Sequence, residues 1–259
     1  MDIRIEPTPE AVATLAADFI DDALAHPATT IGLATGSTPL ATYDELVRRH
    51  ERHGLRFDHA AYVLLDEYVG IDADHPASSR RFIHEVFTDR VGVPRSAVHG
   101  PPGDATDLAA AADEYEALLR ALPRRRVQLL GIGRDGHIGF NEPTSSLASR
   151  TRVKTLHAAT RADNERFFDD GETVPRHALT MGIGTILEAE RLLLLATGPA
   201  KAPAIAAALE GPVTAMVPAS ALQLHPDAVV VLDEQAAAEL TTGDYLRDIA
   251  RHRPDWQRR

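Results

Sequence analysis

Apolar residues repeat along two parts of the chain at the spacing of one face of a helix. Between Pro9 and His26 they fall at positions i, i+3, i+4 and i+7, and the same spacing returns between Leu108 and Leu122. This period is typical of an amphipathic helix that packs on a sheet. Both segments are therefore expected to be helices that cover a hydrophobic face.

Other segments are apolar without alternation, namely "TTIGLATG", "AAYVLLDEY", "RVQLLGIG", "RLLLLATG" and "DAVVVLDE". Short apolar runs separated by helical segments are typical of strands that are buried on both faces of a parallel sheet. The pattern predicts a doubly wound, mainly parallel α/β sheet with helices on both faces. A chain of 259 residues with 44% apolar content is long enough for one such domain, which we expect to span 1–259.

The composition of the chain disfavours several classes of function and location. A net charge of -11 disfavours nucleic acid as a partner, because such a partner needs a dominant basic face. There is no cysteine for a disulfide or a thiolate metal site, and no apolar run could span a bilayer. The first residues, "MDIRIEPTPE", also lack the pattern of a signal peptide. A soluble, unsecreted protein of the cytoplasm is expected, with no membrane partner.

The two lysines stand out among 27 Lys and Arg residues, because every other basic residue of this group is Arg. Lys154 and Lys201 either survive by chance on the surface or mark places where a compact ammonium group is needed.

Chemically reactive groups follow four of the expected strands, in "ATGSTP", "DEY", "GIGRDGH" and "ATGPAK". In open α/β sheets the ligand crevice lies beyond the carboxyl ends of the strands, so these motifs are expected to meet in space. The run "PRRR" at 123–126 is expected to be a solvated connection between a helix and a strand.

The first of these motifs has the features of an anion site. In "GLATGSTPL" a strand stops at a glycine, Ser37 and Thr38 offer hydroxyl groups, and a helix can begin near Pro39. Free N–H groups and the positive end of the helix dipole attract phosphate. The alternative is an ordinary capped turn, and the motif is not a P-loop because the Gly-Lys-Ser/Thr ending is missing.

Asp66 and Glu67 follow six apolar residues, so they are expected at the end of a buried strand. Neighbouring side chains on a strand point to opposite sides, which makes it difficult for both to face one ligand. One can be a general base while the other is a structural cap, and a purely structural role for both is the alternative.

The stretch "GIGRDGHIGFNEP" at 131–143 combines glycines with Asp135, His137 and Glu142. A carboxylate that fixes the tautomer of an imidazole raises its basicity, and the ring can then transfer a proton near neutral pH. A metal site is less favoured, since no second imidazole lies nearby at helical spacing. An Asp-Gly turn beside a packed histidine is the remaining alternative.

Together these motifs resemble the glucosamine-6-phosphate deaminase family. The resemblance rests on "LATGSTPLATYDELV", "LLDEYVGIDADHPASS", "GIGRDGHIGFNEPTSSLASRTRVKTL", "ALTMGIGTILEAE" and "LQLHPDAVVVLDE", and runs from about Ile3 to Leu240. It implies a Rossmann-like sheet and conversion of glucosamine 6-phosphate and water to fructose 6-phosphate and ammonium, by a hydrolase that needs no metal or organic cofactor.

The resemblance also implies roles for individual residues. Asp66 would move a proton between C2 and C1, and His137 would open the sugar ring, with Asp135 and Glu142 orienting the histidine. The residues implied around the substrate phosphate are Gly36, Ser37, Thr38, Arg166 and Lys201.

A regulatory site is implied by "TSSLASRTRVKT", because activated hexameric members of the family carry this string between subunits. The residues implied there are Ser145, Ser146, Arg152, Lys154 and Thr155. Alternation in "TRVKT" places Arg152 and Lys154 on one face of a strand, where they could hold a phosphate. A homo-oligomer, with a hexamer as one form, and N-acetylglucosamine 6-phosphate as activator are therefore expected; a simple exposed basic strand is the alternative.

The polar segment at 156–178, which carries Arg166, is expected to be a mobile lid over bound substrate. Two rival functions are a 6-phosphogluconolactonase and a non-catalytic sugar-phosphate sensor. The lactonase is disfavoured because "IGFNEP" follows the histidine and adds the carboxylate of Glu142. The sensor is disfavoured because the chain starts almost directly at the sheet domain and carries a net negative charge.

Overall fold

A computed structural model of the chain describes residues 1–169 and 171–254. Within these ranges, seven strands form one sheet in the order β1-β10-β9-β6-β2-β3-β5, and all pairs between neighbours are parallel. The strands are β1 (Asp2–Glu6), β2 (Thr29–Leu33), β3 (Ala60–Leu64), β5 (Val98–His99), β6 (Arg125–Leu130), β9 (Arg191–Ala196) and β10 (Ala228–Asp233). The predicted doubly wound α/β sheet is confirmed.

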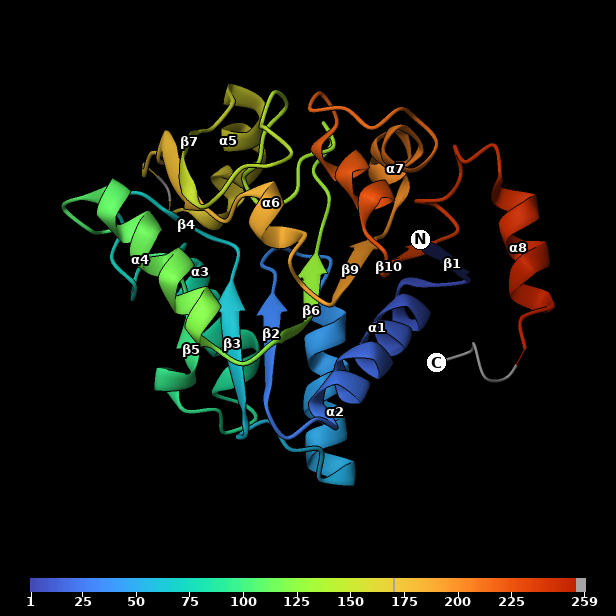
Figure 1. Ribbon diagram of the computed structural model, residues 1–259, viewed down its shortest axis with the longest axis horizontal. Coiled ribbons are helices and arrows are strands. Elements are labelled where there is room, and N and C mark those ends of the chain that lie inside the picture. The colour runs from blue at the N-terminus through green and yellow to red at the C-terminus, as the bar shows by residue number, and fades with distance from the viewer. Residues whose placement is uncertain (170, 255–259) are drawn as a thin grey trace.

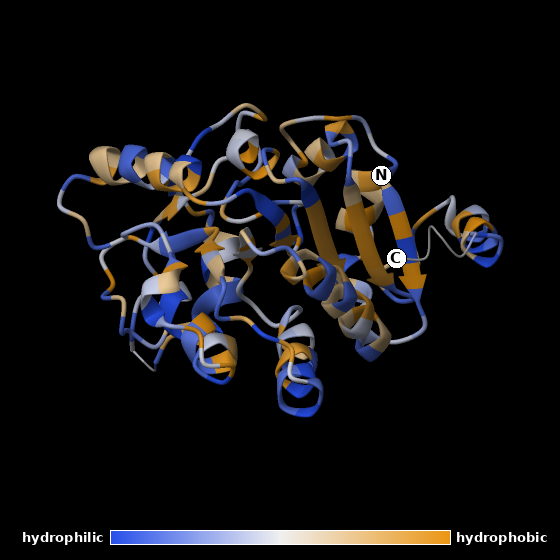
Figure 2. Ribbon diagram, turned by 60° about the horizontal axis from the view of Figure 1, so that its bottom comes forward, coloured by the Kyte–Doolittle hydropathy of each residue, from blue (hydrophilic) through white to orange (hydrophobic). Residues whose placement is uncertain are grey.

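Helices cover both sides of this sheet, whose central strands are strongly hydrophobic (Figure 2). The α-helices are α1 (Pro9–Leu24), α2 (Leu40–His53), α3 (Ser79–Ile83), α4 (Leu108–Ala121), α5 (Ala158–Asn164), α6 (Ile183–Ile186), α7 (Ala202–Leu209) and α8 (Gly243–Arg251). The 3₁₀-helical segments are η2 (Arg95–Ala97), η3 (Glu165–Phe167), η4 (Pro199–Lys201) and η5 (Pro218–Leu224), and η1 (His84–Thr88) is a π-helical turn. None of the helices in the described ranges has the length and apolar character that a bilayer crossing requires.

The sheet is held by a continuous hydrophobic core. Ile31, Leu129, Leu193 and Val230, from four neighbouring strands, are fully buried. Helix α1 packs across β2, β6, β9 and β10 through its apolar face, which confirms the helix expected from the spacing after Pro9. Its first turn is capped by the Thr8 hydroxyl, which accepts from the Ala11 amide at 3.2 Å.

The strand order fixes where a ligand can bind. From β2 the chain moves outward through β3 to β5, whereas from β6 it moves the opposite way through β9 to β10. The order therefore reverses between β2 and β6, and a crevice opens beyond the carboxyl ends of strands at such a reversal. In Figure 1 these ends point toward the part of the chain that carries β7, β4 and α5.

A second, antiparallel sheet lies there, and the hydrophobic pattern did not predict it. Within the described part of the chain it has the order β4-β8-β7, with β4 (Asp66–Tyr68), β7 (Arg152–Thr155) and β8 (His177–Thr180). The run "AAYVLLDEY" is therefore not one strand, because the chain leaves the central sheet after Leu64 and pairs with β8 from Asp66 onward. Asp66 begins a strand of the second sheet instead of ending a strand of the first.

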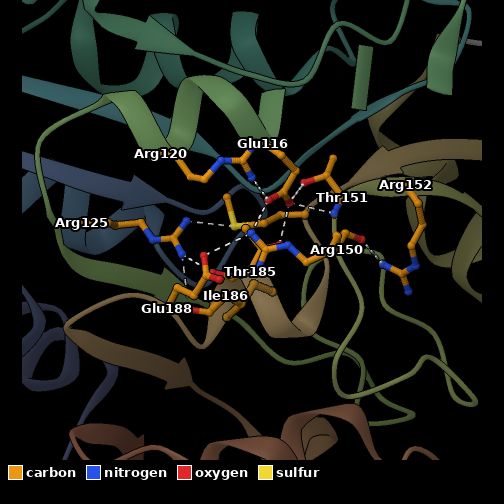
Figure 3. Close-up of polar contacts among 10 residues, drawn as sticks. Glu116, Arg120, Arg125, Arg150, Thr151, Arg152, Thr185, Ile186 and Glu188 are labelled. Carbon is orange, nitrogen blue, oxygen red and sulfur yellow. Dashed lines mark hydrogen bonds and ion pairs between the residues drawn. The ribbon is translucent and has the colours of Figure 1, made fainter. Parts of the chain in front are cut away.

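Buried polar contacts anchor this second sheet to α4 (Figure 3). The Glu116 carboxylate accepts from the Thr151 amide at 2.9 Å and from the hydroxyls of Thr151 and Thr185 at 2.6 Å each, and it pairs with Arg150. Although burial opposes the shift, these hydrogen bonds hold the pKa of Glu116 below its ordinary value. Residues 150–151 lead directly into β7, so Glu116 fixes the start of that strand.

The run at 123–126 was expected to be a solvated connection between a helix and a strand, but its second half belongs to β6. Arg125 opens β6, and its side chain is half-buried, donating to the carbonyls of Thr185 and Ile186 and contacting the sulfur of Met181 (Figure 3). Burial lowers the pKa of Arg125 to about 10. The run was predicted to be solvated because three adjacent arginines are polar. Carbonyl groups of α6 supply the partners that allow Arg125 to be half-buried.

Removing the Glu116 carboxylate should destabilise the fold strongly. Glu116→Ala leaves two hydroxyls and an amide without their acceptor, and we expect it to lower the free energy of unfolding by about 3 kcal/mol. Urea unfolding of both proteins measures this difference. Glu188→Ala is the matched control, since Glu188 also pairs with Arg150 but its side chain is 57% exposed, and less than about 1 kcal/mol is expected. Equal losses in the two variants would contradict the assignment.

Candidate active site

A cavity of about 230 Å³ opens at the carboxyl ends of β2 and β6, where the strand order reverses. Its walls come from the loops after β2 and β6, from β4, from the start of α3, and from α5 and η3. The predicted site residues that line it are Gly36, Ser37, Thr38, Asp66, His137, Arg166 and Lys201. Motifs that are far apart in the sequence therefore meet at one place, as expected for this class of sheet.

The loop after β2 forms one wall of the cavity, with the start of α2 beside it. Gly36 has a φ of +97°, a conformation that glycine adopts without strain, and α2 begins four residues later. Pro39 precedes the first helical residue and makes no side-chain cap, so the amide groups of the first turn are not capped by it. This wall can bind an anion.

Cationic side chains line the cavity as well. Lys201 donates from Nζ to the Ile132 carbonyl at 2.6 Å, and the Arg166 guanidinium stacks 4.8 Å from the centre of the Phe167 ring. Burial, followed by the charge of Arg134, lowers the pKa of Lys201. Arg134 also lines the cavity, and its Nε lies 3.6 Å from the Asp163 carboxylate on α5. Sequence reasoning missed Arg134, although its place beside Asp135 in the glycine-rich loop was a usable signal.

Asp66 presents a carboxyl group to the cavity although it is only 6% exposed. Burial raises its pKa to about 7, and the charge of Glu67 adds to this, while His137 and a hydrogen bond from Ser79 act in the opposite direction. A carboxyl group with a pKa near the working pH can both accept and return a proton. This geometry suits a general base.

Glu67 points away from Asp66 and has the structural role that strand alternation allowed. Its carboxylate accepts from the Ser78 hydroxyl at 2.7 Å and from the amides of Tyr68 and Ser79 at 3.0 and 3.1 Å. It therefore caps α3 and does not line the cavity. Of the two candidates for a base, the structure brings only Asp66 to the cavity.

His137 is held by Asp135. The Nδ1 atom lies 2.6 Å from the Asp135 carboxylate, which also accepts from the His137 amide at 3.1 Å. Although burial opposes it, the hydrogen bond from His137 keeps the pKa of Asp135 below its ordinary value, so this carboxylate is ionised. An ionised acceptor makes Nδ1 the donor and leaves Nε2 free to exchange a proton with a ligand.

Glu142 lies beside Asp135 and His137 and is only 6% exposed. One of its carboxylate oxygens accepts from the His157 amide at 3.2 Å. One potential ligand atom from each of Asp135, His137 and Glu142 lies within 4.8 Å of the others, a spacing that would also suit a cation. The short Asp135–His137 hydrogen bond already uses Nδ1 of the imidazole. The arrangement therefore favours a proton relay over a metal site.

The sequence matches, over residues 6–231, the family described as glucosamine-6-phosphate isomerases/6-phosphogluconolactonase. The chain belongs to this family. It is 51% identical over 258 residues to the glucosamine-6-phosphate deaminase of Corynebacterium kroppenstedtii, covering 100% of both chains. The corresponding protein of Streptomyces coelicolor is 50% identical over 259 residues, with 99% of each chain covered. The resemblance seen in the motifs is confirmed.

Solved structures of the glucosamine-6-phosphate isomerase/6-phosphogluconolactonase family agree with this fold. A monomeric glucosamine-6-phosphate deaminase, described as a missing link of the NagB superfamily, is 43% identical with a TM-score of 0.90, covering 92% of this chain and 100% of its own. A 6-phosphogluconolactonase from Trypanosoma brucei is 23% identical with a TM-score of 0.72, covering 93% of this chain and 98% of its own, which shows a shared fold only.

The residues expected at the regulatory site lie on and before β7, away from the cavity walls. Arg152 and Lys154 are half-buried while Val153 and Thr155 are exposed, so the two cations share one face of the strand as predicted. Arg152 donates to the Asn141 side chain at 2.7 Å. Ser145 is buried, and Ser146, at the turn before β7, accepts from the Ala148 amide at 3.3 Å.

The segment expected to be a lid contains more regular structure than its polar composition suggested. Residues 158–164 form α5 and 165–167 form η3 before β8 begins at His177. Asn164 donates from Nδ2 to the Tyr68 hydroxyl at 2.9 Å, so α5 contacts the strand that carries Asp66. The apolar period was hidden because α5 is only seven residues long.

Proposed function

We propose that this chain converts glucosamine 6-phosphate and water to fructose 6-phosphate and ammonium. The observation that carries the proposal is the buried Asp66 carboxyl group, with a pKa of about 7, in the same cavity as a histidine oriented by Asp135. The relatives named glucosamine-6-phosphate deaminase, at about half identity over the full length, support it. No metal or organic cofactor is needed for the steps below.

The first step is ring opening. Nε2 of His137 takes the proton of the C1 hydroxyl and returns it to the ring oxygen as the bond between C1 and the ring oxygen breaks, which gives the open-chain aldehyde. Asp135 stabilises the charged imidazole throughout, because its ionised carboxylate holds Nδ1 at 2.6 Å. Glu142 orients Asp135 and His137 from its buried position.

Proton transfer between carbons follows. The aldehyde at C1 acidifies the C2 proton, and ionised Asp66 takes it to give an enolamine. Protonated Asp66 then delivers this proton to C1, which restores the ionised carboxylate and leaves an imine at C2. Water adds to this imine and ammonia leaves, so the product is fructose 6-phosphate. Gly36, Ser37, Thr38, Arg166 and Lys201 bind the phosphate and hold C2 beside Asp66.

The 6-phosphogluconolactonase reaction is the second candidate within the family. Glu142, which follows the histidine in "IGFNEP", supports the deaminase instead. The experiment is to offer the purified protein glucosamine 6-phosphate and 6-phosphogluconolactone side by side. Turnover of the amino sugar phosphate with no hydrolysis of the lactone above the spontaneous rate is the expected result, and the reverse preference would overturn the proposal.

We further propose that 156–178 closes over bound substrate. Arg166 and Phe167 line the cavity, and Asn164 contacts Tyr68, so a ligand can order this segment directly. Fructose 6-phosphate at saturation should slow amide hydrogen exchange in α5 and η3. Equal exchange with and without this ligand would argue against closure.

Regulation by N-acetylglucosamine 6-phosphate is a further part of the proposal, together with a homo-oligomer that could be a hexamer. Arg152 and Lys154 on one face of β7 support an anion site. The 43% identical relative is described as monomeric, which instead favours a simple exposed basic strand. The activator should lower the substrate concentration for half-maximal rate, with a coupling of about 1 to 3 kcal/mol.

Lys154→Ala tests this regulation, because it should abolish the response and leave the saturated rate largely intact. Steady-state rates with and without the activator, and the solution mass of the wild type, are the measurements. A rate curve that the activator leaves unchanged, or a monomer in solution, would show that the basic strand has no regulatory role.

A further inference from the structure

Asn141 is a fully buried polar residue that the proposed mechanism does not use. It lies in the loop after β6, four residues beyond His137, and it does not line the cavity. Its side chain nevertheless has three partners: Nδ2 donates to the carbonyls of Ile138 and Met181 at 2.9 and 2.8 Å, and Oδ1 accepts from Nη1 of Arg152 at 2.7 Å. Because these partners use both amide hydrogens and the oxygen, the buried amide has one fixed orientation.

The contact with Ile138 fixes the turn that follows the histidine. Ile138 comes directly after His137, and its carbonyl accepts from both the side chain and the backbone amide of Asn141, the latter at 3.1 Å. Gly139, inside this turn, has a φ of +53°, a conformation that glycine adopts without strain. The turn is therefore closed by two donors from one residue, and the placement of His137 depends on where Asn141 is held.

The contact with Met181 ties this turn to the strand that carries the general base. Met181 follows the last residue of β8, and while its carbonyl accepts from Asn141, its amide donates to the Leu65 carbonyl at 2.7 Å. Leu65 directly precedes Asp66. Met181 thus holds both the turn after His137 and the start of β4, and these two elements supply the two catalytic groups.

Arg152 completes the arrangement across the second sheet. Thr180 of β8 is the register partner of Asp66 on β4 and of Arg152 on β7, so the three residues form one row. From the end of this row Arg152 donates to Oδ1 of Asn141. The Thr180 hydroxyl, at its centre, accepts from the Phe140 amide of the turn at 3.1 Å. The row that contains the general base therefore contacts the turn at two points.

We propose that Asn141, oriented by Arg152, is a positioning residue that holds the turn after His137 against β8. It thereby sets where the imidazole lies relative to the carboxyl group of Asp66. The inference rests on the proposed roles of these two groups in ring opening and proton transfer. It also gives Arg152 a role that operates without any activator, which distinguishes it from the regulatory role proposed above.

The separate effects on kcat and KM test the proposal. Asn141→Asp keeps the shape of the side chain but turns a second acceptor oxygen toward the carbonyls of Ile138 and Met181, so the turn has to move. A displacement of about 1 Å at a catalytic group can lower the rate by about 10²-fold, and this loss is expected in kcat. KM should change by no more than a few-fold, because Arg166 and Lys201 line the cavity and Asn141 does not.

Arg152→Met is the second variant, because it keeps the length of the side chain and removes the donor to Asn141. Its kcat, measured without activator, should fall by about tenfold. Val153→Thr is the matched control with wild-type kcat, since Val153 lies on the same strand and is exposed on its other face. Circular dichroism gives the folded fraction of each protein, because unfolding could cause a hundredfold loss only if almost none of the protein were folded. If Asn141→Asp does not fold, Arg152→Met decides.

A second readout does not depend on turnover. The carbon-bound ring proton signals of His137, assigned by their absence in His137→Gln, report the surroundings of the imidazole. They should shift in Asn141→Asp and Arg152→Met and stay in place in Val153→Thr. Ring signals that do not move or a wild-type kcat in either folded variant, or an equal loss in the control, would overturn the positioning role. Shifted signals in the variants of a protein that has no deaminase activity would refute the proposed function alone.

Discussion

Asp66→Asn is expected to lower kcat by roughly 10²- to 10⁴-fold while substrate still binds, because asparagine keeps the shape of the side chain but cannot accept the C2 proton. Exchange of the C2 hydrogen with deuterated solvent should slow in parallel. Steady-state rates and proton NMR of the substrate measure both quantities. Wild-type exchange in the variant would move the base to another residue.

Stability supplies the control for this variant. The pKa of Asp66 is about 7 in the folded chain and about 3.9 when unfolded, so the folded state binds the proton more tightly. This contribution to stability is present below pH 4 and is lost as the pH rises toward and through 7. At pH 8, Asp66→Asn should therefore be more stable than the wild type, by about 2 to 4 kcal/mol. A less stable variant at pH 8 would mean that lost activity reflects unfolding.

Gly133→Ala is expected to lower kcat/KM by about 10²-fold, since a displacement of about 1 Å at a catalytic group can have this effect. A Cβ atom at position 133 would lie 2.1 Å from Cε1 of His137, so the imidazole must move away from its present position. The Gly133 amide also donates to the His137 carbonyl at 2.9 Å, which keeps the two residues together. Nδ1 and Nε2 of the ring would also lie 2.3 and 2.5 Å from this Cβ, so the ring as a whole has to shift.

The position of the imidazole provides the second measurement for Gly133→Ala. The Nδ1 proton signal of His137, which reports the 2.6 Å hydrogen bond to Asp135, should shift or disappear in the variant. His137→Gln gives the reference for complete loss of the ring. Wild-type kcat/KM together with an unchanged signal would contradict the close packing of Gly133 against His137.

The hydrophobic pattern was sufficient to predict the central sheet, because the strands of this sheet are buried on both faces. The continuous apolar runs around Ile31, Leu129 and Leu193 have no polar face, and such runs are typical of a parallel sheet that is covered on both faces. The second sheet carries no such signal. Its strands are three or four residues long, and although the alternation in "TRVKT" indicated an extended segment at β7, nothing in the pattern showed that β4, β8 and β7 pair with one another.

The candidate site could be located from the sequence for a similar reason. Reactive groups after buried strands must converge at the reversal of strand order, and Asp66, His137 and Lys201 do. What could not be predicted depends on tertiary contacts. The first turn of α3 is held in the cavity wall because Glu67 binds it, and Arg125 is half-buried because α6 ends beside it.

The ratio of ammonium released to fructose 6-phosphate formed tests the proposed reaction most directly. The purified protein is incubated with glucosamine 6-phosphate and a chelator, and both products are measured in the same samples, with Asp66→Asn as the matched control. Because loss of ammonia and formation of the ketose belong to one reaction, equimolar products are expected from the wild type, with both reduced together in the variant. Fructose 6-phosphate without ammonium, or neither product from folded protein that hydrolyses 6-phosphogluconolactone, would contradict the proposed function.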